Sequence, residues 1–404
     1  MISRDRWVVR IALIGVTISG IFSTLYFVFY TDINLIHLPD FQTYRTSAIY
    51  ALESKKFIGT GPNYVYLPIT LIFYLPLAFL PVSVAYTSLF VVNVIGGILI
   101  YIEVMKIFDI HYIEIRITDK ILIFGSILLS PTLIGNLFNG QPNYWLVVFI
   151  LLGYRHIILG NDYIGGAVFA LPAIIKLWPA FLGLWLIYRR SYKGVLSAIL
   201  TGVSAIAGSV VIFGYETNVD YFKYIIYSRS WTSRFSEGLD PSAGLVSIRR
   251  AISMTFPTMQ PESMMLVGFL ILSPIIYLYY RSIDSTVGDL AVLEATIIVV
   301  LLSLPSIYPY YILVFVPALP LVYMAESYIL STMASICLFL SVFTINASKF
   351  TSISDSLLPE LVSNPLNSIA YPVLSYITPP AIGSIGLLLI IYLIYMNGRE
   401  FVNS

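Results

Sequence analysis

The chain has 404 residues and a formal net charge of +1, with 58% hydrophobic and only 11% charged residues. A soluble protein of this size would carry about a quarter charged residues, so the composition excludes an ordinary soluble enzyme and predicts an integral membrane protein. The near-neutral charge offers no basic field for nucleic acid. Three dispersed histidines and one cysteine predict neither a metal centre nor an internal disulfide.

Apolar stretches long enough to cross a bilayer recur along the chain. In lipid such stretches must be helices, because every backbone polar group has to be satisfied within the segment. The predicted fold is therefore all-α and polytopic, with about twelve transmembrane helices. The expected spans are 8–30, 66–80, 82–105, 121–138, 142–159, 162–188, 195–213, 263–280, 288–304, 310–326, 328–345 and 376–396.

Three long polar stretches, 31–65, 214–262 and 346–375, divide this apolar pattern. We expect a transmembrane module over 1–213 that contains the first loop, a long loop over 214–262, and further transmembrane helices over 263–404. Lysines and arginines gather in cytoplasmic loops of membrane proteins. The basic residues that set the orientation are Arg4, Arg6, Arg10, Arg189, Arg190, Lys193, Arg281 and Arg399. They predict a multi-pass cell-membrane protein with both termini in the cytoplasm and all three long loops on the outer face.

Two topologies remain open between residues 66 and 188. The twelve-span count leaves Lys106, Arg116, Lys120 and Arg155 outside, against the charge bias. The alternative makes 66–80 re-entrant and splits 162–188 into two passes at the Trp178–Pro179 break. Both topologies keep the three long loops on the same side.

The first loop contains the strongest candidate for a catalytic group. Phe41, Tyr44, Ala48 and Leu52 recur at helical spacing and predict a short amphipathic helix on the membrane surface. Asp40 opens this helix, and a carboxylate at the lipid–water boundary can act as a general base on a hydroxyl. The simpler interpretation is that Asp40 caps the helix as a solvated loop acid.

Cations next to apolar segments are candidate phosphate ligands. Lys176 lies in an apolar run, where a lysine usually faces a cavity or a partner, although it can also extend to the interface or pair with a buried acid. Arg249 and Arg250 follow in the second long loop, and paired arginines beside a membrane bind either lipid headgroups or the phosphate of a lipid-linked substrate. Arg45, in the first loop, is a further candidate.

Two polar breaks complete the set of candidates. Asn139 and Gln141 belong to the stretch NGQPN between two apolar spans, where amides either line a cavity or simply form a turn. Tyr308 and Tyr310 belong to the stretch PSIYPYY between two later spans. Their hydroxyls can donate to a phosphate or a sugar, although most tyrosines at that depth form the aromatic belt.

The order of these motifs resembles the polyprenyl-phosphate-mannose-dependent mannosyltransferases, the GT-C fold glycosyltransferases of family 87. The resemblance covers about residues 1–320. It starts with Asp40 and Tyr44, continues with NGQPN at 139–143 and IIKLWPA at 174–180, and ends with SAGLVSIRR at 242–250 and LPSIYPYYILVFVPAL at 304–319. The spaced pair of NGQ and IIKLWPA is its most specific part.

The resemblance implies an inverting, metal-independent transfer of a hexose, expected to be mannose. The donor would be a polyprenyl or dolichyl monophosphate sugar, the acceptor a hydroxyl of a glycolipid or glycan on the outer face, and no cofactor would be needed. Asp40 would be the catalytic acid of the family motif, Lys176 its lysine, and Arg249 or Arg250 its late arginine. The second long loop would follow the seventh span, which we take to favour the twelve-span count.

One departure from the family pattern lies near the end of the resemblance. Relatives usually have a tryptophan and a histidine where this chain has Tyr308 and Tyr310. If that histidine contacts the donor phosphate in relatives, Tyr310 would have to do so with a neutral hydroxyl. Two other classes remain as alternatives. A transporter or lipid flippase would place ionisable residues along a path through several helices, and a ligase or polymerase acting on lipid-diphosphate sugars would be expected to have a larger outer loop with histidines.

Overall fold

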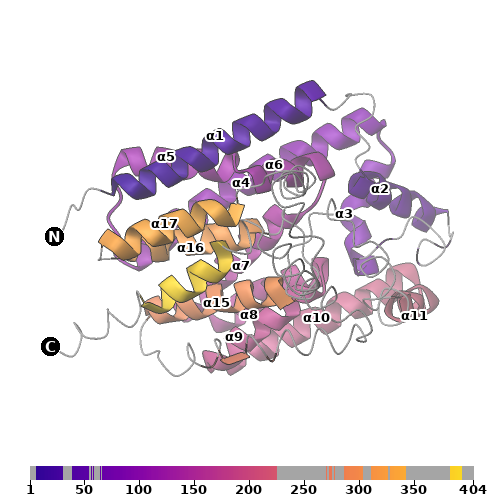
Figure 1. The fold of residues 1–404 in the computed structure, drawn as a ribbon. Helices are drawn as coiled ribbons and strands as arrows, with labels where there is room; N and C mark the ends of the chain where they lie inside the picture. The colour runs from indigo at the N-terminus through magenta and orange to yellow at the C-terminus, as the bar shows by residue number, and fades with distance from the viewer. Residues whose placement is uncertain are drawn as a thin grey trace, which may run out of the picture. The chain divides into compact units, whose positions relative to one another are not determined.

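The computed structural model describes residues 6–30, 39–53, 56, 58, 64, 66–224, 270, 273–274, 277, 286–303, 311–325, 328–342 and 383–393. Every regular element in these ranges is helical (Figure 1). The helices are α1 (Trp7–Tyr30), α2 (Pro39–Leu52), η2 (Pro68–Thr70), α3 (Leu71–Ala78), α4 (Val82–Ile110), α5 (Ile117–Leu128), α6 (Pro131–Asn139), α7 (Asn143–Ile158), α8 (Asp162–Ile175), η3 (Trp178–Leu182), α9 (Gly183–Tyr188), α10 (Tyr192–Phe213), α11 (Tyr215–Lys223), α15 (Thr286–Ser303), α16 (Ile312–Met324) and α17 (Tyr328–Val342).

Four helices in the described ranges are long and apolar enough to cross a membrane. They are Trp7–Leu25, Val82–Ile110, Ile117–Asn139 (which joins α5 and α6) and Tyr192–Phe213. Only 6% of the residues in an apolar 18-residue window of the last one are buried in the described structure, so much of its surface is suited to contact lipid. The other apolar helices are shorter, and the expected span 263–280 lies mostly outside the described residues. The all-helical membrane architecture is therefore confirmed, whereas the count of twelve spans is not.

The chain divides into two compact units. The first consists of residues 1–23, 104–132 and 234–404, and the second of residues 24–103 and 133–233. The predicted boundaries at 213 and 262 are not tested by this division and stay predictions.

In the first unit, the starts of α1 and α5 lie side by side. The guanidinium of Arg10 donates to both carboxylate oxygens of Asp119, at 2.7 and 3.2 Å. The chain between these residues must therefore return to the side from which it started, that is, cross the membrane an even number of times. Helices α1 and α4 already supply two crossings, and a third crossing by 66–80 would make the number odd. The contact therefore favours the alternative topology, in which 66–80 is re-entrant.

The second unit contains a helical hairpin that reverses at Lys176. The starts of α8 and α10 adjoin, since Ser197 Oγ donates to the carbonyl oxygen of Tyr163 at 2.6 Å. The chain therefore runs away from this contact along α8 and returns to it along η3 and α9. This also favours the alternative topology, with the break at Lys176–Leu177 instead of at Trp178–Pro179. Both topologies make α10 the seventh pass, so the position of the second long loop does not distinguish them.

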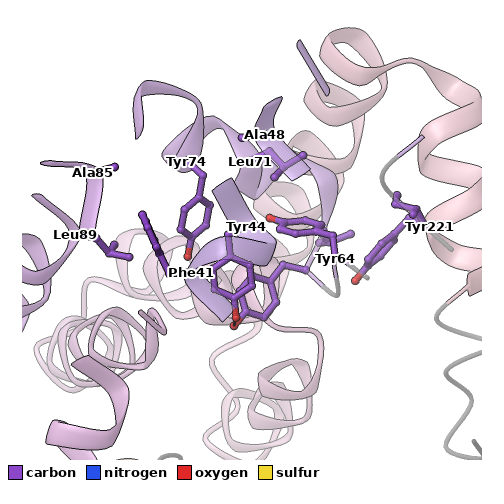
Figure 2. Packing of buried hydrophobic residues seen from close by; sticks show 12 residues of the cluster. Phe41, Tyr44, Ala48, Tyr64, Leu71, Tyr74, Ala85, Leu89 and Tyr221 are labelled. Carbon is purple, nitrogen blue, oxygen red and sulfur yellow. Dashed lines mark hydrogen bonds between the residues drawn. The ribbon is translucent and has the colours of Figure 1, made fainter. Parts of the chain in front are cut away.

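Helix α2 forms in the first loop as the apolar spacing predicts. Pro39 lies in its first turn, where proline costs no hydrogen bond, and Asp40 follows where the helix dipole favours an anion. Phe41, Tyr44 and Ala48 are buried in one apolar cluster with residues of η2, α3, α4 and α11 (Figure 2). The predicted apolar face thus packs on protein, while Leu52 at its end is exposed.

The same cluster brings the start of the second long loop to the first loop. Tyr221 of α11 is fully buried in it, and Figure 2 shows its ring on the far side of Tyr64 from Tyr44. Lys56 and Asp220 form an ion pair at 3.4 Å at the exposed edge. The described residues of the two loops are therefore neighbours, whereas 346–375 lies outside the described ranges.

Candidate active site

The NGQPN stretch forms a tight reversal between α6 and α7. Gly140 has a φ of +67°, its N–H donates to the carbonyl of Leu137, and the N–H of Gln141 donates to the carbonyl of Asn136. This is a Schellman turn, which requires the left-handed conformation that glycine adopts without strain. Pro142 has no N–H with which to continue α6, and α7 begins at the next residue. The turn holds the side chain of Gln141 in a fixed place.

Gln141 connects this turn to the first loop. Its Nε2 donates a short hydrogen bond to Oδ2 of Asp40, 101 residues earlier in the chain. Asp40 is half-buried, and no residue in the described ranges donates a hydrogen bond to its Oδ1. The contact brings together two predicted site residues and leaves one carboxylate oxygen able to accept a proton.

Lys176 reaches the same place from the reversal of the α8 hairpin. Its backbone is extended, with φ −132° and ψ 133°, directly after α8 ends, and Pro179 prevents an immediate return to regular α-helix. Its side chain is 5% exposed, and Nζ donates to Oδ1 of Asn143 at 2.7 Å. The predicted intramembrane lysine therefore has a polar partner inside the protein instead of reaching the interface.

Asn143 joins the cation to the carboxylate. Its Nδ2 donates to Oε1 of Gln141 at 2.7 Å and makes a short hydrogen bond to Oδ1 of Asn136. The result is a continuous hydrogen-bonded path from Lys176 through Asn143 and Gln141 to Asp40, which we call the amide relay. All four residues belong to the second unit.

Tyrosines of the first loop form one wall beside the relay. The hydroxyls of Tyr44 and Tyr66 are hydrogen-bonded at 2.6 Å, and Nζ of Lys176 lies 5.4 Å from the centroid of the Tyr66 ring. The Tyr44 ring also contacts Tyr64 and Tyr74, with centroids 6.0 and 5.0 Å apart (Figure 2). Burial raises the pKa of Tyr64 well above the usual value of a phenol, so its hydroxyl stays uncharged at neutral pH.

Two other predicted site residues lie outside the relay. The guanidinium of Arg45 donates to the carbonyls of Leu77, Ala78 and Leu80 at the end of α3, at 3.0 to 3.4 Å. It therefore caps a helix C-terminus, where a cation also complements the dipole. Asn139 is half-buried as the last residue of α6, beside the Schellman turn.

Four further predicted ligands, Arg249, Arg250, Tyr308 and Tyr310, lie outside the described residues, as does the first-loop histidine His37. Their roles stay predictions. In the described ranges, no three His, Cys, Asp or Glu side chains gather closely enough to hold a metal ion.

Asparagines that the sequence reasoning did not select complete the site. Asn143 of the relay and its partner Asn136 are fully buried. Asn93 of α4 donates from Nδ2 to the backbone carbonyl of Gln141 at 3.3 Å. The signal that marks them is a polar residue inside an apolar helical run, which is rare and usually functional in membrane proteins. Such a residue is visible in the sequence, but its partner is not.

The arrangement connects an anion at the start of α2 to a buried cation at the end of α8, through the NGQPN break between α6 and α7. Non-helical backbone at membrane depth is tolerated where it is enclosed in protein or lines a polar cavity. The backbone at the NGQPN break and at Lys176 is enclosed in protein beside the polar side chains of the relay. A half-buried carboxylate with one oxygen to which no described residue donates a hydrogen bond can accept a proton from a substrate hydroxyl. The site is thus suited to general base chemistry.

Comparison with known proteins supports an enzymatic site. The sequence model of glycosyltransferase family 87 matches residues 64–305, which is more than half of the chain. The match includes Gln141, Asn143 and Lys176 and begins after Asp40. No curated protein and no solved structure matches the chain. The chain belongs to glycosyltransferase family 87 and is a membrane glycosyltransferase.

Proposed function

We propose that the protein transfers a hexose, mannose in the first instance, from a polyprenyl or dolichyl monophosphate to an acceptor hydroxyl on the outer face of the membrane. The observation that carries the proposal is the hydrogen bond from Gln141 to Asp40, which joins the first loop to a motif inside the family match. Family membership supports a transferase over the transporter and flippase alternative.

The proposed chemistry is a single inverting displacement. Asp40 takes the proton of the acceptor hydroxyl through Oδ1, and the hydroxyl oxygen forms a bond to the anomeric carbon. The bond from that carbon to the phosphate oxygen breaks, and the lipid phosphate leaves with the electron pair. Because one displacement occurs from the face opposite the phosphate, the anomeric configuration inverts. General base assistance of this kind contributes about 10² to 10⁴ in rate.

The departing phosphate gains negative charge, and cations placed against it stabilise the transition state more than the ground state. Arg249 and Arg250 are the proposed ligands, since a guanidinium binds a phosphate with two parallel hydrogen bonds. Arg45 is already engaged with the carbonyls at the end of α3, which makes it a weaker candidate. A lipid monophosphate leaving group neutralised by arginines would need no metal ion.

The proposal is tested by the class of donor that the purified protein accepts. Radiolabelled mannose or glucose would be supplied as polyprenyl monophosphate, as polyprenyl diphosphate or as nucleotide sugar, together with a membrane lipid extract as acceptor. We expect label to enter the acceptor only from a monophosphate donor, with inverted anomeric configuration in the product. Transfer from the diphosphate would instead support the ligase or polymerase alternative. Absence of transfer from every donor, with uptake of the labelled lipid into sealed vesicles, would support the flippase alternative.

A further inference from the structure

The amide relay has a single direction. Lys176 carries only donors and Asp40 carries only acceptors when ionised. Each amide between them therefore has to accept through its oxygen on the lysine side and donate through its nitrogen on the aspartate side. The contacts follow this order without exception, from Nζ to Asn143 Oδ1, from Asn143 Nδ2 to Gln141 Oε1, and from Gln141 Nε2 to Asp40 Oδ2.

Each amide in the relay is both fixed and enclosed. Asn143 is fully buried and uses its oxygen for Lys176 and its nitrogen for Gln141 and Asn136. Gln141 is 4% exposed, and Asn93 holds its backbone carbonyl. In surroundings of low dielectric, aligned hydrogen bonds polarise one another. The ammonium charge of Lys176 therefore strengthens the donor that Gln141 offers to Asp40.

We propose that Lys176 acts on Asp40 through Asn143 and Gln141, and that it is not a ligand of the donor phosphate. Lys176, Asn143 and Gln141 are then positioning residues, which hold the carboxylate of Asp40 in one orientation with Oδ1 turned to the acceptor. The inference rests on the proposed role of Asp40 as the base. It adds Gln141 and Asn143 of one motif to the residues that act on the base. It also gives Lys176 a role that a side chain with only 5% exposure can perform, because the role needs no contact with the substrate.

The inference distinguishes two kinetic outcomes for loss of the lysine charge. A phosphate ligand contacts the donor in the ground state as well as in the transition state, so its removal raises the KM for the donor in addition to lowering kcat. A residue that positions the base acts in the chemical step, so its removal lowers kcat and leaves the donor KM unchanged. The effects of substituting two residues of one hydrogen-bonded path are also non-additive, because the second substitution interrupts a path that the first has already broken.

The test compares Lys176→Met, Asn143→Leu and the double variant with the full-length wild type, in the monophosphate-donor assay. We expect each single variant to lower kcat by about tenfold or more, which corresponds in rate to one charge-assisted hydrogen bond, and the double variant to be no slower than the slower single variant. Lys193→Met, a change of an exposed lysine at the start of α10, is the matched control and should keep wild-type kinetics. A raised donor KM for Lys176→Met, whatever happens to kcat, or additive effects in the double variant, would overturn the inference.

A second variant keeps the test decisive if the apolar replacements impair folding. Gln141→Glu preserves shape but places a second carboxyl against Asp40, and two carboxylates that share a site cannot both ionise easily. In the part of the chain that the structure describes, Lys176 and Tyr74 of α3 interact electrostatically with Asp40, and neither is altered. We expect the acid limb of the pH–kcat profile to move to higher pH by at least about one unit. An unmoved limb would show that Gln141 does not act on the base.

Failure of the inference can be separated from failure of the proposed function. If Asp40→Asn abolishes transfer while the relay variants raise the donor KM, the role of Asp40 as base is retained and the relay is refuted. If Asp40→Asn transfers at the wild-type rate, both are refuted.

Discussion

Gly140 lies directly against Phe41. A Cβ on Gly140 would stand 2.6 Å from the Cβ of Phe41, far inside van der Waals contact, and Phe41 is the residue that follows Asp40. The turn that carries Gln141 and the helix that carries Asp40 therefore meet through a position that has room only for glycine. This contact sets the spacing between the two ends of their hydrogen bond.

Gly140→Ala should reduce both stability and transfer. The change forces an alanine into φ +67°, which costs about 1 to 2 kcal/mol, and it also displaces Phe41 and with it Asp40. Gly160→Ala is a matched control, because Gly160 closes an equivalent turn after α7 with φ +80° and has no atom within 4 Å of the added Cβ. Thermal unfolding in detergent should show a loss for both variants, whereas the transfer assay should show a loss for Gly140→Ala alone. Equal activity of the two variants would contradict the proposed contact.

The ion pair between α4 and α7 should be important for stability. Arg155 Nε donates to Oε2 of Glu103 at 2.6 Å, with side chains 18% and 8% exposed. Arg155→Met leaves a buried carboxylate without its guanidinium, which typically costs about 3 to 5 kcal/mol. We expect the double variant with Glu103→Gln to regain most of that loss. Asp109→Asn, an exposed change near the end of α4, should shift the unfolding midpoint by little, and a similar shift for Asp109→Asn and Arg155→Met would argue against the pair.

The contact of Arg10 with Asp119 predicts the side on which the loop after α4 lies. Tyr112 in that loop is 93% exposed, so Tyr112→Cys in a Cys337→Ser background provides a single reactive thiol. Because α1 and α5 start together, an impermeant maleimide should label it from the side of the N-terminus only. Leu52→Cys, on exposed residue Leu52 of α2, should be labelled from the opposite side. Labelling of both thiols from one side would restore the twelve-span arrangement over residues 66–80.

The fold class and the first-loop helix could be predicted because both depend on local pattern. An apolar stretch long enough to cross a bilayer must be helical in lipid. The spacing of Phe41, Tyr44 and Ala48 predicts a buried helix face, whether lipid or protein covers it. The number of passes could not be predicted in this way. It depends on whether a short apolar stretch such as 66–80 crosses or returns, and that is decided by a distant contact such as the one from Arg10 to Asp119.

The two charged residues of the candidate site could be predicted from the sequence, whereas the hydrogen bonds of the amides between them could not. Asp40 and Lys176 stand out because an ionisable group beside or within an apolar run is costly. Asn143 occurs in the same motif as Gln141, but its role follows from a partner 33 residues away, which no local pattern reveals. Arg45 shows the opposite case, since its charge suggested a phosphate ligand and its position between α2 and α3 makes it a helix cap.

The most direct test of the account is the single-turnover transfer rate of Asp40→Asn with a saturating monophosphate donor and acceptor. Asparagine keeps the size of the side chain and an oxygen for Gln141 but cannot accept the proton. The account predicts a rate about 10² to 10⁴ lower than wild type, with the unfolding temperature unchanged. Glu53→Gln, at an exposed residue just after α2, should transfer at the wild-type rate. Wild-type transfer by Asp40→Asn would contradict the assignment of Asp40 as the base.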